Sequence, residues 1–358
     1  MPLAELHGHD DLRRRLAHNI ASGSLPSSLL LHGPRGVGKQ RLALWVAQAL
    51  LCTGENPPCG ECQSCKYSRN VAHPDLHWYF PRTRLKDPDP SLEDVKDDYR
   101  EAITERLANH GLYPPPPGNE GIYIATIRSI VHDAAFAPAM GSRKVFIVGD
   151  AEQMGFQEGS EYAANAFLKL LEEPPANTWV IITSSEPGAL LPTIRSRTAA
   201  VRITRLDEPS MRKFASDPVV REALKAAGST QSVNESIAMA DGAPGNLFGD
   251  DARARAMSAA RKLIEAASSR LVSDRHAAAL AVGASGARGG FSDILDALVI
   301  LLGERMRAAL YDDNQAQALA VSRLADKVGE ARVLAIGNVN PQLITASLLH
   351  DLSVALHD

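Results

Sequence analysis

The spacing of apolar and polar residues changes along this chain and predicts distinct regions. In the first 205 residues, short uninterrupted apolar runs alternate with segments whose apolar residues have helical spacing. Uninterrupted runs are typical of strands in a parallel sheet that is covered on both faces. The pattern therefore predicts a parallel, doubly wound α/β fold. The expected strands span residues 28–32, 73–79, 144–149, 179–183 and 200–203, and the expected helices span residues 3–22, 40–52, 122–138 and 163–173.

After residue 206 the pattern is helical. Two short helices over residues 208–227 and 231–240 end at a turn over residues 242–245. Beyond residue 250, a wide apolar stripe runs from Phe291 to Met306. Such a stripe usually fills the core of its own bundle, but it could also meet a sister subunit. A last helix is expected after the N-cap and proline at residues 340 and 341. The predicted domains span residues 1–205, 206–248 and 249–358.

A glycine-rich loop joins the first strand to the next helix. It has the spacing Gly33-x-x-x-x-Gly38-Lys39, with a further glycine at Gly36. Glycines let backbone N–H groups turn toward phosphate oxygens, the helix N-terminus adds its positive dipole, and the lysine reaches the outer phosphates. A serine or threonine normally follows and ligates Mg²⁺, but here Gln40 offers a poorer, bulkier ligand. The sequence predicts a nucleotide loop damaged at the metal; a chance match is the alternative, which the flanking strand and helix disfavour.

All four cysteines of the chain fall in one short segment with the spacing Cys52-x6-Cys59-x2-Cys62-x2-Cys65. Prolines and a glycine between them shape a tight knuckle. Four thiolates can close the tetrahedral shell of a structural Zn²⁺ ion, and the metal would supply folding energy to such a small module. The segment has no histidine and no open ligand position that would indicate catalysis. The alternative is four unpaired thiols.

Composition narrows the class of protein. The 358 residues are 45% hydrophobic and 22% charged, with a net charge of −4, so no global basic field points to nucleic acid or a membrane. The first residues lack the pattern of a signal peptide, and no apolar run could span a bilayer, so we expect a cytoplasmic protein. Residues 81–120 are polar and proline-rich, which indicates an insertion between stiff linkers. Its role stays open between partner contact and decoration.

Three further segments have a recognisable sequence beside the loop and the knuckle. They read Lys-Val-Phe-Ile-Val-Gly-Asp at residues 144–150, Asn-Ala-Phe-Leu-Lys-Leu-Leu-Glu-Glu-Pro-Pro at 165–175 and Leu-Pro-Thr-Ile-Arg-Ser-Arg-Thr at 191–198. Together these stretches resemble bacterial clamp-loader subunits of DNA polymerase III, which belong to the AAA+ class. The resemblance covers nearly the whole chain except the insertion. It implies an α/β P-loop (AAA+) domain, a small helical lid and an all-α C-terminal collar.

The resemblance also implies roles for individual residues. Residues 33–39 correspond to the Walker A loop, and residues 147–150 correspond to the end of the Walker B strand, which includes Asp150. A polar residue within 183–185 would act as sensor 1, and the turn at 242–245 is similar to the sensor 2 turn.

Departures from the family pattern decide the expected role. Gln40 replaces the hydroxyl that ligates magnesium. Gly149 and Asp150 stand where the pattern has aspartate followed by glutamate, and Asn246 stands near the expected sensor 2 arginine. Losing both metal anchors costs several kcal/mol of barrier, on the order of what metal stabilisation contributes. The sequence therefore predicts very poor ATP hydrolysis or none, and Lys39 could still hold a nucleotide phosphate weakly.

Arg197 aligns with the arginine finger of the family, whose guanidinium reaches the ATP of a neighbouring subunit. The alternative for this residue is a local salt bridge. The resemblance implies a stator that assembles with delta and the ATP-hydrolysing gamma or tau subunits to load the sliding clamp on primed DNA, held through its backbone. Two other functions stay open. One is an active gamma/tau-type ATPase subunit, and the other is a zinc-containing DNA-binding or repair adaptor.

Overall fold

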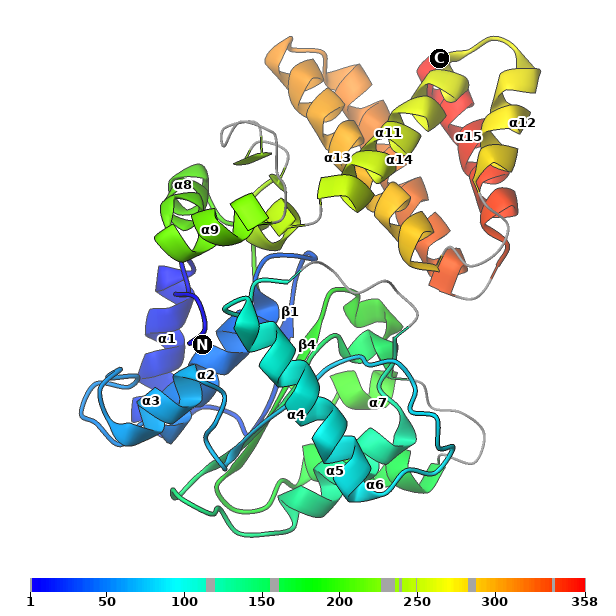
Figure 1. The fold of residues 1–358 in the computed structure, drawn as a ribbon. Helices are drawn as coiled ribbons and strands as arrows, with labels where there is room; N and C mark the ends of the chain where they lie inside the picture. Colours follow the sequence, from blue (N-terminus) through cyan, green and yellow to red (C-terminus); the bar gives the residue numbers. More distant parts are fainter. Residues whose placement is uncertain are drawn as a thin grey trace. The chain divides into compact units, whose positions relative to one another are not determined.

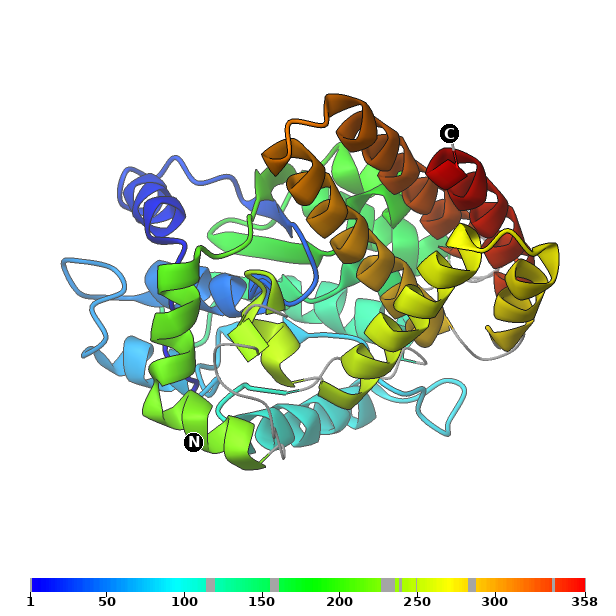
Figure 2. The same cartoon turned by 90° about the horizontal axis from the view of Figure 1, so that it is seen from above.

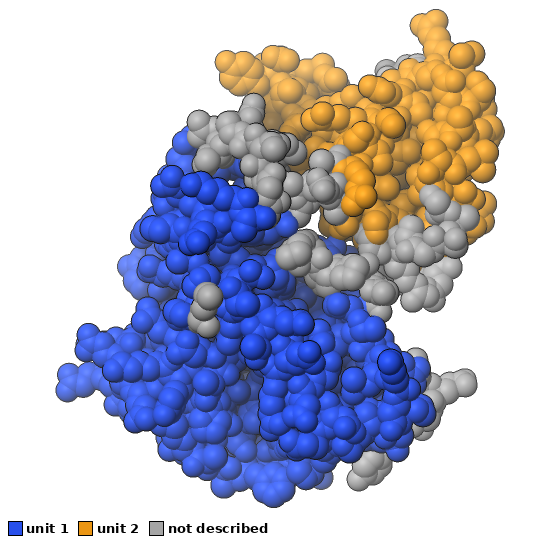
Figure 3. Space-filling model, in the orientation of Figure 1, with its two compact units in different colours: residues 1–115, 120–248 blue, residues 116–119, 249–358 orange. Residues whose placement is uncertain are grey.

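The computed structural model describes residues 2–113, 120–154, 161–226, 236–237, 240–248, 250–282, 288–336 and 339–357. These residues form two compact units, and the boundary along the sequence lies between Phe248 and Asp250. Figure 3 shows the two units in different colours. The short helices that follow the sheet belong to the first unit. The proline run of the predicted insertion and most of the predicted helix at 231–240 lie outside the described residues.

Five parallel strands form one sheet in the order β2-β3-β4-β1-β5. Every residue of β3 is buried, which requires cover on both faces of the sheet. The predicted parallel α/β fold is confirmed. Strand β1 lies between β4 and β5. Because all strands are parallel, the loop after β1 lies at the carboxyl edge of the sheet, where ligands bind in such folds. The strands are β1 (Ser28–His32), β2 (Leu76–Tyr79), β3 (Lys144–Val148), β4 (Thr178–Ser184) and β5 (Ala199–Arg202).

Helices surround this sheet (Figures 1 and 2). Helix α2 is buried at eleven of its 13 residues, which fits its position directly after the central strand. Helix α4 packs on α5, and α5 packs on α6. The helices of the first unit are α1 (Asp10–Ala21), α2 (Lys39–Leu51), α3 (Gln63–Arg69), α4 (Leu92–Ala108), α5 (Ile124–Ala134), α6 (Glu161–Glu172), α7 (Pro192–Arg195), α8 (Glu208–Ser216) and α9 (Pro218–Ala226), with the 3-10 turns η1 (Ala151–Gln153), η2 (Pro187–Ala189) and η3 (Pro244–Phe248).

The predicted insertion is part of the core of the first unit. Helix α4 starts with a capping box between Ser91 and Asp94. Its inner face buries Val95, Tyr99 and Ala102 against the main hydrophobic cluster. The Tyr99 hydroxyl also donates a hydrogen bond to the carbonyl oxygen of Phe80 at 2.7 Å. The described part of this segment is therefore fixed to the sheet and does not act as a detached arm.

Two predicted helices are shorter than expected. The first begins at Asp10 because Gly8 and His9 have φ of +75° and +56°, which no helix accommodates. The residues before Gly8 instead bond to other segments, for example through the N–H of Leu3 and the carbonyl of Arg69. The helix expected over 122–138 ends at Ala134.

The second unit is a bundle of α11 (Asp250–Ser268), α12 (Val272–Ala281), α13 (Arg288–Tyr311), α14 (Gln315–Ile336) and α15 (Pro341–His357). Helix α13 packs on α14 and α11, and α15 packs on α11, α12 and α14. The predicted stripe fills the core of this bundle, since Phe291, Leu295 and Leu298 are at most 2% exposed. Asn340 caps α15 by accepting a hydrogen bond from the N–H of Gln342. No helix among the described residues is both long and apolar enough to cross a membrane.

Asp75 is a fully buried carboxylate just before β2. Its oxygens accept hydrogen bonds from the backbone N–H groups of Ala139, Met140 and Gly141 at 2.5–3.0 Å. Burial acts to raise the pKa of Asp75, but the three N–H donors outweigh it and hold the pKa below its ordinary value. The stabilisation is therefore complete above the unfolded-state pKa, near 4, and it is lost as the pH falls through the lower folded-state pKa.

We expect Asp75→Ala to lower the free energy of unfolding by about 3 kcal/mol, because three backbone N–H groups lose their buried carboxylate acceptor at once. Chemical denaturation followed by circular dichroism measures this change. Asp89→Ala is the matched control, since the Asp89 side chain is 81% exposed and pairs with Arg128 at the surface. That variant should change the stability by less than about 0.5 kcal/mol. Equal losses in the two variants would contradict the capping role of Asp75.

Candidate functional site

The glycine-rich loop runs from β1 to the first residue of α2, as predicted. A Cβ atom at Gly33 would lie 2.1 Å from the carbonyl oxygen of Ile203, so only glycine fits there. Gly36 and Gly38 have φ of +80° and +89°, a left-handed conformation that glycine adopts without strain. These bends wrap the loop around the N-terminus of α2, which is a favourable place for an anion.

Lys39 lies within the loop and is 5% exposed. Its Nζ atom donates to the carbonyl oxygens of Gly33 and Pro34 at 3.1 and 2.9 Å, and to the Ser185 hydroxyl at 2.8 Å. Burial lowers the pKa of Lys39, and the nearby Asp150 carboxylate opposes that shift. Ser185 comes from the segment predicted to hold the sensor 1 residue, so the structure brings that segment and the loop lysine together.

Gln40 occupies the position that normally carries the magnesium-binding hydroxyl. Its Nε2 atom donates to the Asp150 carboxylate at 2.8 Å, and its Oε1 atom accepts from the Trp78 indole N–H at 3.0 Å. A Cβ atom on Gly149 would lie 2.4 Å from the Gln40 side-chain carbon. The glutamine amide therefore fills the space that any side chain at residue 149 would need.

The carboxylate that faces residue 40 belongs to Asp150, the second residue of the Gly149 and Asp150 pair. Asp150 has a φ of +47° and is held by a hydrogen bond from its N–H to the Thr183 hydroxyl at 3.0 Å. The next residue, Ala151, is buried and has only a methyl side chain.

Two further residues of the site escaped the sequence analysis. Arg106, near the end of α4, reaches Gln40 Oε1 with its Nη1 atom at 3.5 Å. Trp78 of β2 provides the indole that bonds the same oxygen. Residues 40 and 106 are 66 positions apart, and no local pattern connects an insertion helix with a phosphate loop. In the sequence, only the aromatic residues in and after β2 indicated that side chains line the site at this edge of the sheet.

Glu152 also belongs to the site. Its Oε1 atom accepts a hydrogen bond from the N–H of Ser185 at 2.9 Å, while its buried Oε2 atom has no partner in the described part of the chain. Burial, together with the neighbouring Asp150 carboxylate, raises the pKa of Glu152 to about 7. The carboxyl group therefore titrates near neutral pH at the carboxyl edge of the sheet.

The turn predicted as sensor 2 lies against the loop. The N–H of Gly245 donates to the carbonyl oxygen of Gly36 at 2.8 Å. A Cβ atom at Gly36 would lie 2.8 Å from the side-chain oxygen of Asn246, so the two segments are in tight contact. The side-chain amide of Asn246 thus contacts the loop, near the position where the family pattern has an arginine.

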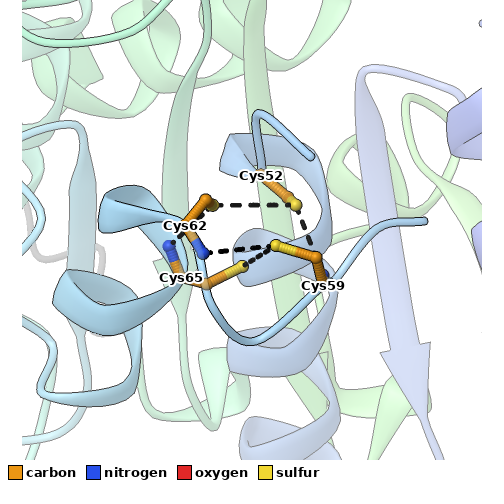
Figure 4. Close-up of side chains that lie close together, drawn as sticks. All are labelled: Cys52, Cys59, Cys62 and Cys65. Atoms are coloured by element: carbon orange, nitrogen blue, oxygen red, sulfur yellow. Dashed lines mark hydrogen bonds between the residues drawn. The ribbon is translucent and has the colours of Figure 1, made fainter. Parts of the chain in front are cut away.

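The four cysteines form a compact cluster between α2 and α3 (Figure 4). The Sγ atoms of Cys52 and Cys62 are 3.9 Å apart, and those of Cys59 and Cys65 are 4.0 Å apart. All four sulfur atoms lie within 4.8 Å of one another. Tetrahedral zinc, with Zn–S bonds of about 2.3 Å, needs sulfur atoms about 3.8 Å apart. The predicted ligand set is therefore assembled with the spacing that zinc requires.

Backbone N–H groups point at the sulfur atoms. Cys52 Sγ accepts from the N–H of Gly54 and of Cys59 at 3.3 and 3.4 Å, and Cys62 Sγ accepts from the N–H of Cys65 at 3.4 Å. Although burial opposes the effect, such N–H donors lower the pKa of Cys62 to about 5. At Cys62 these bonds favour thiolate, the form that binds metal, whereas burial raises the pKa of Cys52 and of Cys65.

Arg197 lies between α7 and β5, at the amino edge of the sheet, whereas the phosphate loop opens at the carboxyl edge. Its Nε atom donates to the Glu172 carboxylate at 2.9 Å, and its Nη1 atom donates to the carbonyl oxygen of Thr193 at 3.2 Å. In the single chain Arg197 therefore forms a local salt bridge, which is the alternative to an arginine finger that the sequence left open. The side chain remains 31% exposed.

Comparison with known proteins gives the family. The family model described as "DNA polymerase III, delta subunit" matches residues 8–207. The DNA polymerase III subunit delta' of Pseudomonas aeruginosa is 32% identical over 172 residues, which are 47% of this chain and 40% of that protein. The DNA polymerase III subunit tau of Salmonella typhimurium is 26% identical over 211 residues, which are 58% of this chain and 26% of that protein.

The chain thus spans less than half the length of these curated relatives. Among solved structures, a DNA polymerase III gamma subunit-related protein of Thermotoga maritima aligns with 97% of this chain and 99% of its own, at 17% identity and a TM-score of 0.39. The family model covers more than half of the 358 residues, from the first helix through the last strand of the sheet. This chain belongs to the DNA polymerase III delta-subunit family.

Proposed function

We propose that this chain is a clamp-loader subunit of the delta' type, which hydrolyses ATP very poorly or not at all and assists the turnover of a neighbouring subunit. The observation that carries this proposal is the bond between the Gln40 amide and the Asp150 carboxylate. In an active P-loop site, a hydroxyl at position 40 and a carboxylate at the end of the strand hold hydrated Mg²⁺. Here the hydroxyl is absent, and a neutral amide holds the carboxylate.

The loss of the catalytic glutamate adds to this effect. Phosphoryl transfer depends almost entirely on positioning and charge neutralisation, and one residue must orient the attacking water. Ala151 offers no group that can do so. Glu152 comes next in the chain, but one of its oxygens is engaged by the N–H of Ser185. Together these differences remove several kcal/mol of transition-state stabilisation.

The arginine finger is the second part of the proposal. Because Arg197 and the loop lie at opposite edges of the same parallel sheet, Arg197 can serve a phosphate only in another subunit. An arginine finger supplied in trans accelerates hydrolysis by roughly 10³–10⁵. In the proposed assembly, Arg197 would leave the exposed Glu172 carboxylate and bind the γ-phosphate of a neighbour's ATP. A partly exposed ion pair of this kind costs at most about 1 kcal/mol to break.

The proposed partners are delta and the gamma or tau subunits of a heteropentamer, together with the sliding clamp and the backbone of primed DNA. In this proposal residues 206–248 act as a lid, and the helical bundle that starts at residue 249 acts as the collar. The four cysteines would hold a structural zinc ion. The proposal is supported by the family and by the delta' relatives.

Two other functions have different requirements. A gamma/tau-type ATPase subunit has support from the tau relatives, but it requires a free metal site at residue 40. A zinc-containing DNA-binding or repair adaptor requires DNA binding by the isolated chain and no partner for its helical bundle. Copurification with the other loader subunits distinguishes the adaptor from a clamp-loader subunit.

The purified chain alone should hydrolyse ATP no faster than a buffer control, with or without Mg²⁺, because no hydroxyl ligates the metal and no glutamate orients water. A coupled phosphate-release assay measures the rate. Robust magnesium-dependent hydrolysis by the isolated chain would instead support the gamma/tau-type function.

Arg197→Ala should lower the ATPase and clamp-loading rates of the reconstituted assembly by at least about tenfold, since one of its ATP sites loses its finger. Arg195→Ala is the matched control, because Arg195 is an exposed arginine at the end of α7, two residues before Arg197. It should leave both rates unchanged. Wild-type rates in the Arg197 variant would rule out the finger.

One Zn²⁺ per chain should copurify with the wild-type protein, and Cys62→Ser should lose it, because a structural site needs all four ligands. Zinc release with a colorimetric chelator measures the content. A thiol reagent gives an independent measurement, since the chain has only these four cysteines. They should react slowly in the native protein and rapidly after the metal is removed, and unprotected thiols in a metal-free native chain would disprove the site.

A further inference from the structure

Arg106 is held in place by aromatic rings beside the phosphate loop. Its guanidinium carbon lies 3.2 Å from the ring centre of Phe80, 4.0 Å from that of Tyr113 and 5.0 Å from that of Trp78. Contacts of this kind stabilise a cation that has lost part of its water shell. Helix α4 carries this residue in its last turn. The position of the guanidinium is thus fixed by the core of the first unit.

Much of the hydrogen-bonding capacity of Arg106 is unused. The Nη1 atom donates to the Tyr113 hydroxyl at 3.1 Å and to Gln40 Oε1 at 3.5 Å. Within the described ranges, Nε and Nη2 have no acceptor, and no carboxylate forms an ion pair with this side chain. The Asp150 and Glu120 carboxylates act on it only from a distance. A guanidinium stays charged in proteins, so among the described residues this positive charge has no direct counter-ion.

The phosphate loop beside it is also without an internal partner. The backbone N–H groups of residues 36–40 donate to no acceptor in the part of the chain that the structure describes. Successive N–H groups of this kind at a helix N-terminus form a nest that favours an anion. Lys39 rests on the loop's own carbonyl oxygens, from which a phosphate could draw it. The loop therefore keeps its donors for phosphate and has lost only the hydroxyl that ligates the cation.

We propose that this loop binds the diphosphate of a nucleotide without a divalent cation, and that Arg106 supplies the positive charge in place of Mg²⁺. The inference rests on the proposed function, in which residue 40 no longer ligates the metal. Gln40 is the shared neighbour of both groups, because it follows Lys39 in the nest and accepts from Arg106. Arginine carries one positive charge where magnesium carries two. The site therefore favours a nucleoside diphosphate over the more highly charged triphosphate.

The test is calorimetric titration of the full chain with ADP, first in excess EDTA and then in excess Mg²⁺. We expect ADP to bind with dissociation constants that agree within about twofold in the two buffers, and ATP to bind more weakly in EDTA. Arg106→Gln should weaken ADP binding at least tenfold. Arg84→Gln is the matched control, since Arg84 lies in the same insertion, is exposed and stacks on Tyr123 instead. It should bind ADP as the wild type does.

Several results would overturn the inference. These are the absence of ADP binding by the wild type, binding that Mg²⁺ tightens tenfold or more, or unchanged or tighter binding in Arg106→Gln. If Arg106→Gln does not fold, Arg106→Lys keeps the charge without the planar fork and should bind ADP with intermediate affinity; the comparison of buffers on the wild type decides in any case. Failure here leaves the proposed stator role intact, because that role is tested by hydrolysis and by Arg197.

Discussion

The amide of Gln40 connects parts of the first unit that are distant in sequence. It accepts a hydrogen bond from Trp78 on β2, donates one to Asp150 after β3, and lies against Gly149, while its own backbone is part of the first turn of α2. An amide offers both donors and an acceptor, so it satisfies an indole N–H and a carboxylate at once. Serine is too short to reach both. The same contact that joins these strands to the helix also occupies the carboxylate that would hold a hydrated cation.

The Gln40 contact also shows what the inserted segment contributes to the site. Helix α4 buries its inner face in the core, and its end carries Arg106 to the oxygen of Gln40. Removing the insertion would therefore expose Phe80 and leave the site without its nearby cation. In a P-loop site that binds Mg²⁺, a guanidinium at this point would compete with the metal for space and would repel it. The side chains of Gln40 and Arg106 are thus compatible with each other, and the glycine at residue 149 leaves room for the glutamine.

Local patterns predicted the features that depend on local sequence. The strands, the loop glycines and the cysteine knuckle each consist of residues close together in the chain, so spacing alone was sufficient. Which residue of the Gly149 and Asp150 region faces residue 40 could not be told from spacing, since adjacent residues at a strand end point to different sides. Arg106 was missed because its partners meet it only through tertiary packing across 66 positions. The first helix was predicted too long because two left-handed residues at its start interrupt an otherwise helical pattern.

Helix α2 explains why a subunit with little turnover would keep a complete phosphate loop. Its first residue is Lys39, and its C-cap is Cys52, the first ligand of the cysteine cluster. Near the same end, the Gln48 side chain bonds the carbonyl oxygen of Cys65. A zinc ion at the cluster would therefore fix one end of a buried helix whose other end is the loop, about 20 Å away at 1.5 Å per residue. The loop conformation and the packing of the core helix are therefore directly connected through Lys39.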